Sequence, residues 1–237
     1  MRTYHFNAPT GTLHPMRTLF STSLLLSFLL MGGCQTPALE DLSLKPKAPP
    51  PTYLPENTFS VDFLPNDFAK VAVLPIHHDL ESGADTVAYM AGTFVNELNS
   101  KSQLEAVTLS GSAMQRLAGE PSVSSISVLP ADLLAQIRSE TGVDGVLFTD
   151  LTHYYPYNPI SIGVRCKLAD AVTGEILWSA DSVYHAGSQQ TQAAALYFQK
   201  QQSGSQFPLQ DSGVILQSPR YFSRFVASTL LDTLPRR

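Results

Sequence analysis

The sequence predicts an α/β fold: a single compact domain with a three-layer-like mixed sheet, made of a parallel half plus an antiparallel hairpin and packed with helices. Segments typical of strands and helices alternate over residues 68–154, which favours parallel strands joined by crossover helices. Two segments of alternating apolar and polar residues follow, joined by a short turn that contains Gly174. This pattern is typical of an antiparallel hairpin. An amphipathic segment over residues 219–234 then predicts a helix that covers the sheet.

The parallel half begins at residues 68–75, a short apolar run that ends at Pro75 and suits a buried strand. Apolar residues at helical spacing predict a helix over residues 85–99, with Asp85 at its N-cap. The remaining elements of this half are expected in the order strand 105–109, helix 110–117, serine-rich loop 119–127, a helix that begins at Pro130 and ends before Gly142, and strand 145–154.

The antiparallel hairpin is predicted over residues 160–170 and 175–185. Its first strand alternates an apolar face with a polar face, as a strand with one face against a core does. The rest of the chain is expected to form a helix over residues 189–202, a polar loop over residues 203–218 and the final helix. In the hairpin we expect two core residues, Cys166 and Trp178, and two residues that face solvent, Arg165 and Lys167.

The N-terminal part of the chain is expected to be removed. An apolar run over residues 18–31 follows Arg17 and leads into small residues, which is typical of a secretory signal peptide over residues 1–33. The alternative is an uncleaved membrane anchor, but the run is shorter than the roughly 20 residues that cross a bilayer. Residues 1–15 show no apolar periodicity, so we expect Met16 to be the true start.

The signal peptide ends in Leu-Met-Gly-Gly-Cys, where the cysteine is Cys34. This order resembles the lipobox of bacterial lipoproteins. The resemblance implies that Cys34 carries fatty-acyl groups, becomes the first residue of the mature chain and anchors it to the lipid bilayer. In lipoproteins of Gram-negative bacteria, an Asp after this cysteine tends to retain the protein in the inner membrane. Gln35 stands there instead, so the resemblance implies an outer-membrane anchor and a domain that faces the periplasm.

A lipidated N-terminus and proline-rich linker are predicted over residues 34–56, ahead of a periplasmic domain over residues 57–237. Proline-rich chains extend by about 3 Å per residue, so we expect the linker to hold the domain off the lipid surface. Because the signal peptide contains Arg2 and Arg17 and no acidic residue, its removal changes the net charge from −5 to −7. A net acidic chain without a Lys/Arg cluster is a poor partner for nucleic acid.

Four short motifs stand in a familiar order: Val-Leu-Pro at 73–75, Phe-Val-Asn-Glu-Leu at 94–98, Thr-Gly-Val-Asp-Gly-Val-Leu at 141–147 and Thr-Gly-Glu-Ile-Leu-Trp at 173–178. Together with the lipobox, this order resembles a group of bacterial envelope lipoproteins and periplasmic domains. The group includes the curli-secretion channel lipoprotein, the lipoprotein activator of a penicillin-binding protein and the N-terminal domain of Tol translocation protein B. The resemblance implies the same mixed-sheet domain and a non-enzymatic role in binding or assembling an envelope component.

One type of member forms an outer-membrane pore from long β-hairpins, so an oligomeric secretion channel is the alternative function. Membrane strands need about 9 to 11 alternating residues each. Residues 155–159 are too few to hold such a hairpin, and residues 201–218 do not alternate. We therefore prefer a periplasmic domain that binds an envelope protein, and a homo-oligomer stays open.

Motifs that carry chemistry are sparse. The sequence contains no nucleophile elbow, zincin helix, P-loop or dinucleotide-binding glycine pattern, so we predict no catalytic residue and no cofactor. His77 and His78, with Asp79, follow the first strand, where α/β sheets often bind ligands, and His153 ends another strand near Asp150. Histidines with a carboxylate suit zinc. Adjacent histidines in so short a loop rarely face one metal, so we predict no metal site. If a metal were bound, His77, His78 and His153 would be its candidate ligands.

The loop over residues 154–159 contains Tyr154, Tyr155 and Tyr157, together with two prolines. Rings held by a rigid loop present aromatic area at low entropic cost, and tyrosine is enriched at interfaces. We expect these three tyrosines to contact an envelope protein. The alternative is that two of the three rings pack back on the sheet edge. The sequence does not identify the partner, which could be a cell-wall synthase, a flagellar part or a secretion apparatus.

Overall fold

The computed structural model describes residues 49–79, 84–101, 104–203 and 213–237. These residues belong to one unit that begins at Pro49. The predicted signal peptide, Cys34 and the first part of the predicted linker lie outside the described residues. In the part of the chain that is described, no helix combines the length and the apolar character needed to span a membrane.

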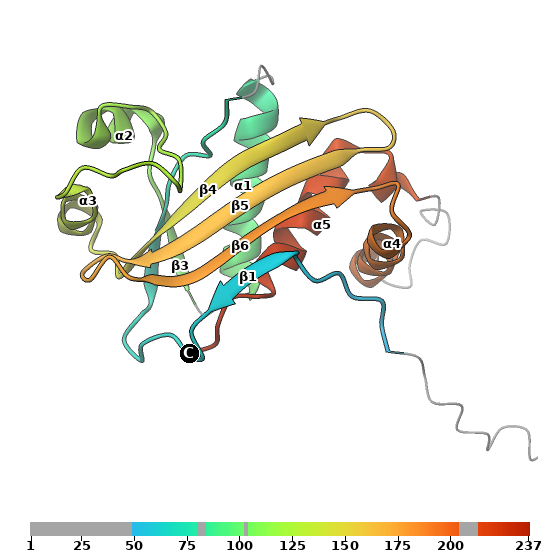
Figure 1. Ribbon diagram of the computed structural model, residues 1–237, viewed down its shortest axis with the longest axis horizontal. Helices are drawn as coiled ribbons and strands as arrows, with labels where there is room; N and C mark the ends of the chain where they lie inside the picture. Colours follow the sequence, from blue (N-terminus) through green and yellow to red (C-terminus); the bar gives the residue numbers. More distant parts are fainter. Residues whose placement is uncertain (1–48, 80–83, 102–103, 204–212) are drawn as a thin grey trace, which may run out of the picture. The chain divides into compact units, whose positions relative to one another are not determined.

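The sheet has six strands in the order β1-β6-β5-β4-β2-β3 (Figure 1). β2 is parallel to β3 and to β4, whereas β4–β5, β5–β6 and β1–β6 are antiparallel pairs. The predicted mixed sheet, with a parallel half and an antiparallel hairpin, is therefore confirmed. The strands span Asn57–Ser60 (β1), Lys70–Val73 (β2), Glu105–Thr108 (β3), Gly145–Tyr155 (β4), Ser161–Asp170 (β5) and Ile176–His185 (β6).

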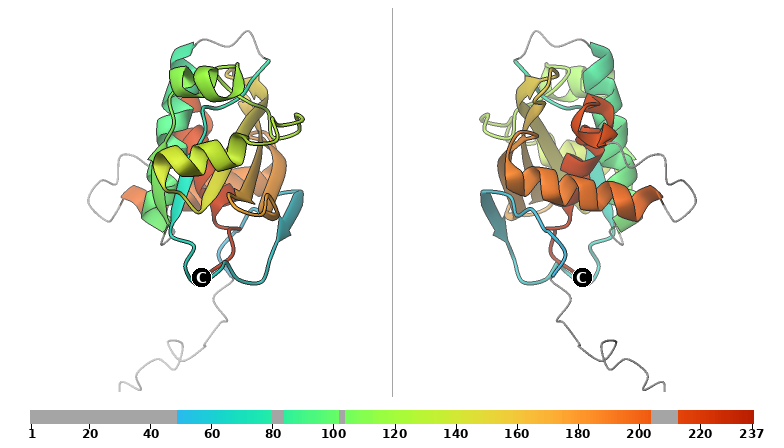
Figure 2. Two further views of the ribbon diagram at one scale, coloured as in Figure 1. Left: turned by 90° about the vertical axis from the view of Figure 1, so that its left-hand side faces the viewer. Right: turned by 90° about the vertical axis from the view of Figure 1, so that its right-hand side faces the viewer.

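Helices lie on both faces of the sheet, which gives the predicted three layers (Figures 1 and 2). On one face α1 and α5 pack against β2, β4, β5 and β6, and α4 adds Ala194 and Ala195 to the same core. On the other face α2 and α3 pack on β2, β4 and the end of β5, and no described residue of β6 belongs to that core. The helices span Ala84–Lys101 (α1), Gly111–Ala118 (α2), Leu133–Thr141 (α3), Gln189–Ser203 (α4) and Pro219–Leu231 (α5).

The ends of α2 and α3 follow from single residues. Ser110 caps α2, because its hydroxyl accepts a hydrogen bond from the backbone N–H of Ala113 at 3.1 Å. Gly142 ends α3 as predicted, with a φ of 67° that favours glycine. The prediction that Pro130 begins this helix was wrong. Residues 130–132 form a turn in which the Leu133 N–H donates to the Pro130 carbonyl at 3.1 Å, so α3 begins at Leu133.

Within the described residues, two elements were not predicted from the sequence. β1 consists of Asn-Thr-Phe-Ser, and all four residues are exposed. It therefore lacks the alternation that marks a half-buried strand. A short 3₁₀ helix, Val214–Leu216, lies within the stretch 203–218 that was predicted to be a loop, and Ile215 in it is buried.

The end of the predicted linker packs on the domain. Tyr53 is 8% exposed, its hydroxyl lies 3.0 Å from Ser182 Oγ, and its ring centroid lies 4.6 Å from that of Tyr184. Pro55 is also buried. Residues 49–56, which we call the N-terminal strap, are thus part of the folded unit, although the sequence was interpreted as a linker as far as residue 56.

The two residues expected in the core of the hairpin are fully buried. Cys166 and Trp178 are both 0% exposed and face the layer that contains α1 and α5. The Trp178 indole N–H donates to Thr233 Oγ1 at 3.0 Å, which ties β6 to the chain just after α5. A buried indole N–H needs such a partner, so this bond fixes α5 on the sheet.

Candidate functional site

The first candidate site contains polar residues from two neighbouring strands, His77 after β2 and Asp150 of β4. His77 follows β2 and forms an isolated parallel bridge with Asp150 of β4. Its N–H donates to the Thr149 carbonyl at 2.9 Å, and its carbonyl accepts from the Leu151 N–H at 2.9 Å. The structure therefore brings together two of the residues that the sequence placed at neighbouring strand ends.

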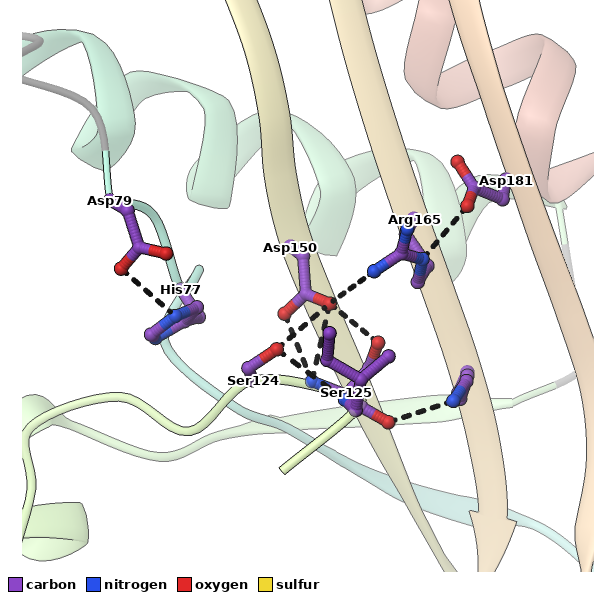
Figure 3. A network of polar contacts seen from close by, with 9 residues as sticks. His77, Asp79, Ser124, Ser125, Asp150, Arg165 and Asp181 are labelled. Carbon is purple, nitrogen blue, oxygen red and sulfur yellow. Dashed lines mark hydrogen bonds and ion pairs between the residues drawn. The ribbon is translucent and has the colours of Figure 1, made fainter. Parts of the chain in front are cut away.

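Asp150 is buried, with 5% of its side chain exposed. Its carboxylate accepts hydrogen bonds from the Ser125 N–H at 3.0 Å, from Ser125 Oγ at 2.5 Å and from Ser124 Oγ at 3.3 Å (Figure 3). A buried carboxylate is costly unless such partners satisfy it. The carboxylate thus fixes the serine-rich loop between α2 and α3 against the sheet.

Two cations of β5 complete this arrangement, which we call the Asp150 network. Arg165 donates from Nε to Asp181 Oδ2 at 2.8 Å, and its Nη1 lies 3.9 Å from Asp150 Oδ2 (Figure 3). Lys167 Nζ donates to the Ser125 carbonyl at 2.8 Å. The expectation that Arg165 and Lys167 simply face solvent was wrong. Both are only partly exposed, because the serine-rich loop and the charge of Asp150 provide partners that the strand pattern does not reveal.

The histidines do not assemble into a metal site. His77 Nδ1 lies 3.4 Å from Ser122 Oγ. His77 Nε2 lies 3.5 Å from Asp79 Oδ1 (Figure 3). His153 is an exposed residue of β4, beyond an irregularity in its pairing with β5. Among the described residues, no three His, Cys, Asp or Glu side chains gather as metal ligands. The oxygens of Asp150 accept hydrogen bonds from the serine-rich loop, so the network holds this loop on the sheet.

The second candidate site is the tip of the hairpin formed by β4 and β5. Tyr154 is partly buried and packs against the main core. Tyr155 and Tyr157 are 47% and 70% exposed, and their rings meet edge to face with centroids 5.6 Å apart. The alternative in which two of the three rings fold back therefore does not describe this loop. We call Tyr155 and Tyr157 the tyrosine pair.

Burial changes the acidity of two groups in the core. The pKa of the Cys166 thiol is raised to about 12, chiefly because burial disfavours the thiolate, and Asp150 and Asp181 add to this. Burial likewise raises the pKa of Tyr184, whose hydroxyl is fully enclosed without a hydrogen-bond partner among the described residues. Thiolates, not thiols, are nucleophilic, so Cys166 is a packing residue, as the sequence predicted.

Ser124 and Ser125 were not predicted as members of the Asp150 network. A signal was present: a serine-rich loop lies between two helices, and an acidic residue stands inside an otherwise apolar strand. An acidic residue at such a position needs internal donors, and nearby hydroxyl groups can supply them.

The fold and these two sites define a mixed-sheet α/β domain with an internally satisfied polar network and an exposed aromatic hairpin tip. No protein-family model and no curated protein matches the chain.

The solved structures that are similar to parts of the chain include the following three. PelC from Paraburkholderia phytofirmans, solved as a dodecamer, is 16% identical with a TM-score of 0.43, and the match covers 76% of this chain and 97% of that one. The lipoprotein GNA1162 from Neisseria meningitidis is 15% identical with a TM-score of 0.38, over 59% and 99% of the two chains. The LpoB C-terminal domain from Salmonella enterica is 19% identical with a TM-score of 0.35, over 49% and 82%. The similar structures thus include a lipoprotein.

Proposed function

We propose that this protein is an outer-membrane lipoprotein of a bacterial envelope, anchored through acylated Cys34. Its periplasmic domain binds or helps to assemble an envelope component and catalyses no reaction. The lipobox-like sequence that ends at Cys34 supports the anchor, and Gln35 supports the outer membrane. The folded unit begins at Pro49, a short distance along the chain from the anchor.

The observation that carries the binding role is the exposure of the tyrosine pair. Tyr155 and Tyr157 lie at the tip of a hairpin whose strands are fixed in the sheet, and each ring supports the other. Exposed aromatic residues on a rigid support are typical anchors of protein interfaces. The Asp150 network, in contrast, uses its polar groups to hold a loop. The proposed partner site is therefore the hairpin tip, with Tyr154 as its support.

Palmitate labelling tests the anchor. Cells that produce the wild-type protein should incorporate radiolabelled palmitate into it, and cells that produce Cys34→Ala should not. The variant should also leave the outer-membrane fraction. Unlabelled wild-type protein, together with unchanged fractionation of the variant, would contradict the proposed anchor.

Photo-cross-linking in cells tests the partner site. A photoreactive residue at position 157 should capture one envelope protein, which mass spectrometry then identifies. A matched control replaces Val172, in the turn between β5 and β6, because it is 68% exposed and Tyr157 is 70% exposed. Capture of the same protein from both positions, or from neither, would contradict a partner site at the hairpin tip.

A further inference from the structure

A set of exposed apolar side chains lies where the described chain begins. Leu54 is 70% exposed, Phe59 is 53% exposed and Phe63 is 69% exposed. They belong to the N-terminal strap, to β1 and to the loop after β1, which form the lower border of the described domain in Figures 1 and 2. We call these three segments, residues 49–67, the β1 edge. Large apolar side chains that are exposed along one border of a domain are available to contact another surface.

The two edges of the sheet differ in how they are protected. At β3, Asn99 of α1 accepts a hydrogen bond from the Ala106 N–H at 3.0 Å, and Lys70 forms an ion pair with Glu105 at 3.5 Å. Charges and covering groups of this kind are the usual protection of an edge strand. β1 contains no charged residue and all its residues are exposed. The unprotected edge is thus the one that carries the exposed phenylalanines.

The N-terminal strap fixes the point at which the preceding chain joins the domain. Tyr53 anchors the strap on β6 through its contacts with Ser182 and Tyr184. Residues 35–48 span at most about 50 Å even when fully extended. An anchor at Cys34 therefore keeps the β1 edge within this distance of the bilayer, whatever conformation the intervening residues adopt.

We infer that the β1 edge contacts the lipid surface to which the chain is anchored, with Leu54, Phe59 and Phe63 in the interfacial region. This inference rests on the proposed anchor at Cys34. Because the anchor makes the contact intramolecular, a small apolar surface suffices to maintain it. Phe and Leu side chains are typical of the apolar face of segments that lie at a membrane interface.

The charges of the β1 edge indicate which force maintains the contact. The backbones of Phe63 and Arg236 form an isolated parallel β-bridge. Arg237 donates from Nη2 to the Asn66 carbonyl at 2.9 Å. Two exposed cations therefore lie near the loop that contains Phe63. Three exposed acidic residues lie on the same edge: Glu56, Asp62 and Asp67. An edge without net positive charge gains little from anionic lipid. The contact therefore depends on apolar burial and persists at high salt.

The test uses the full mature chain with a hexahistidine segment in place of Cys34. The protein is bound to vesicles of phosphatidylethanolamine and phosphatidylglycerol that contain a nickel-chelating lipid. This attachment holds the chain at the same position whether or not Cys34 is acylated in cells. Failure of the lipid contact and failure of the proposed anchor are therefore separate results.

An environment-sensitive fluorophore is placed on Phe63→Cys or, as the matched control, on Tyr157→Cys. The side chains replaced are 69% and 70% exposed, so neither substitution disturbs the core. Cys166 does not react with the fluorophore, because it is 0% exposed and burial raises the pKa of its thiol to about 12.

On vesicles, the fluorophore at position 63 should shift to shorter wavelength and be quenched by brominated lipid, at low and high salt alike. The fluorophore at position 157 should not respond. Equal responses at the two positions, or none at position 63, would overturn the inference. A response at position 63 that grows with protein concentration in the absence of vesicles would assign the β1 edge to a second copy of the chain and would also overturn it.

Discussion

The Asp150 network and the tyrosine pair each include a residue of β4, but the polar groups of the network have partners inside the domain, whereas the rings of the pair are exposed. Asp150 lies in the buried part of the strand, and its carboxylate is bonded to the serine-rich loop. Tyr155 ends the strand, is 47% exposed and packs against Tyr157 in the hairpin tip. Polar groups in the buried part of a strand thus need not form a ligand site. Where internal partners satisfy them they stabilise the fold, whereas exposed aromatic area is available to a partner.

The largest effect is expected from Asp150→Ala. The substitution removes the acceptor of the Ser125 N–H and leaves Arg165 with one carboxylate instead of two. A buried donor that is left without an acceptor costs about 1 to 3 kcal/mol, so the free energy of unfolding, which urea denaturation measures, should fall by at least this amount. Asp79→Ala is the control, because the Asp79 side chain is 94% exposed. Equal losses for the two variants would contradict the stabilising role of the network.

The burial of Cys166 should make the free energy of unfolding depend on pH in the alkaline range. Below the ordinary thiol pKa, about 8.5, the Cys166 thiol is protonated in both the folded and the unfolded chain, so this group does not change the free energy of unfolding with pH. Above it the unfolded chain ionises, whereas the folded thiol stays protonated until about pH 12. The free energy of unfolding should therefore fall by about 1.4 kcal/mol per pH unit from this group in that window. Cys166→Ala should lower this slope, and an unchanged slope would contradict the prediction.

Removal of one buried hydroxyl should have a smaller effect. Tyr53→Phe keeps the ring on Tyr184 but loses the hydrogen bond to Ser182 at 3.0 Å. The free energy of unfolding should decrease by about 1 kcal/mol. Tyr157→Phe, at an exposed position, is the control and should leave it unchanged. Thermal denaturation of the two variants compares a buried with an exposed tyrosine directly.

The smallest effect on stability is expected at the tyrosine pair. Replacing Tyr155 and Tyr157 together by Ser should change the free energy of unfolding by about 0.5 kcal/mol or less, because exposed side chains contribute little. The same variant should lose capture of the partner in a pull-down from cell extracts. A variant that fails to fold would show that these rings belong to the core, which would remove the contrast with Asp150.

The sequence predicted the elements whose apolar residues repeat regularly. β6 and the second half of β5 alternate buried with more exposed residues, because one face packs on the core, and α1 and α5 show helical spacing for the same reason. β1 has no such repeat. Its place is set by pairing with β6, more than one hundred residues away in the chain, as in the pair Phe59 and Ser179. Local pattern carries no information on such a contact.

The candidate sites were predicted less completely than the fold. The approach of His77 to Asp150 followed from parallel strands that end together. The contact of Lys167 with Ser125 did not, because it depends on how the loop between α2 and α3 folds over β5. The division of the tyrosines into one partly buried and two exposed rings also depended on the path of the hairpin tip, which the sequence left open between two alternatives.

The mature N-terminus tests the central claim most directly. Mass spectrometry of the protein purified from outer membranes should show a chain that begins at Cys34. This residue should be heavier than cysteine by a diacylglyceryl group and an N-linked acyl chain. A chain that begins upstream of Cys34, or an unmodified Cys34, would contradict the account of a domain that works while anchored to the envelope.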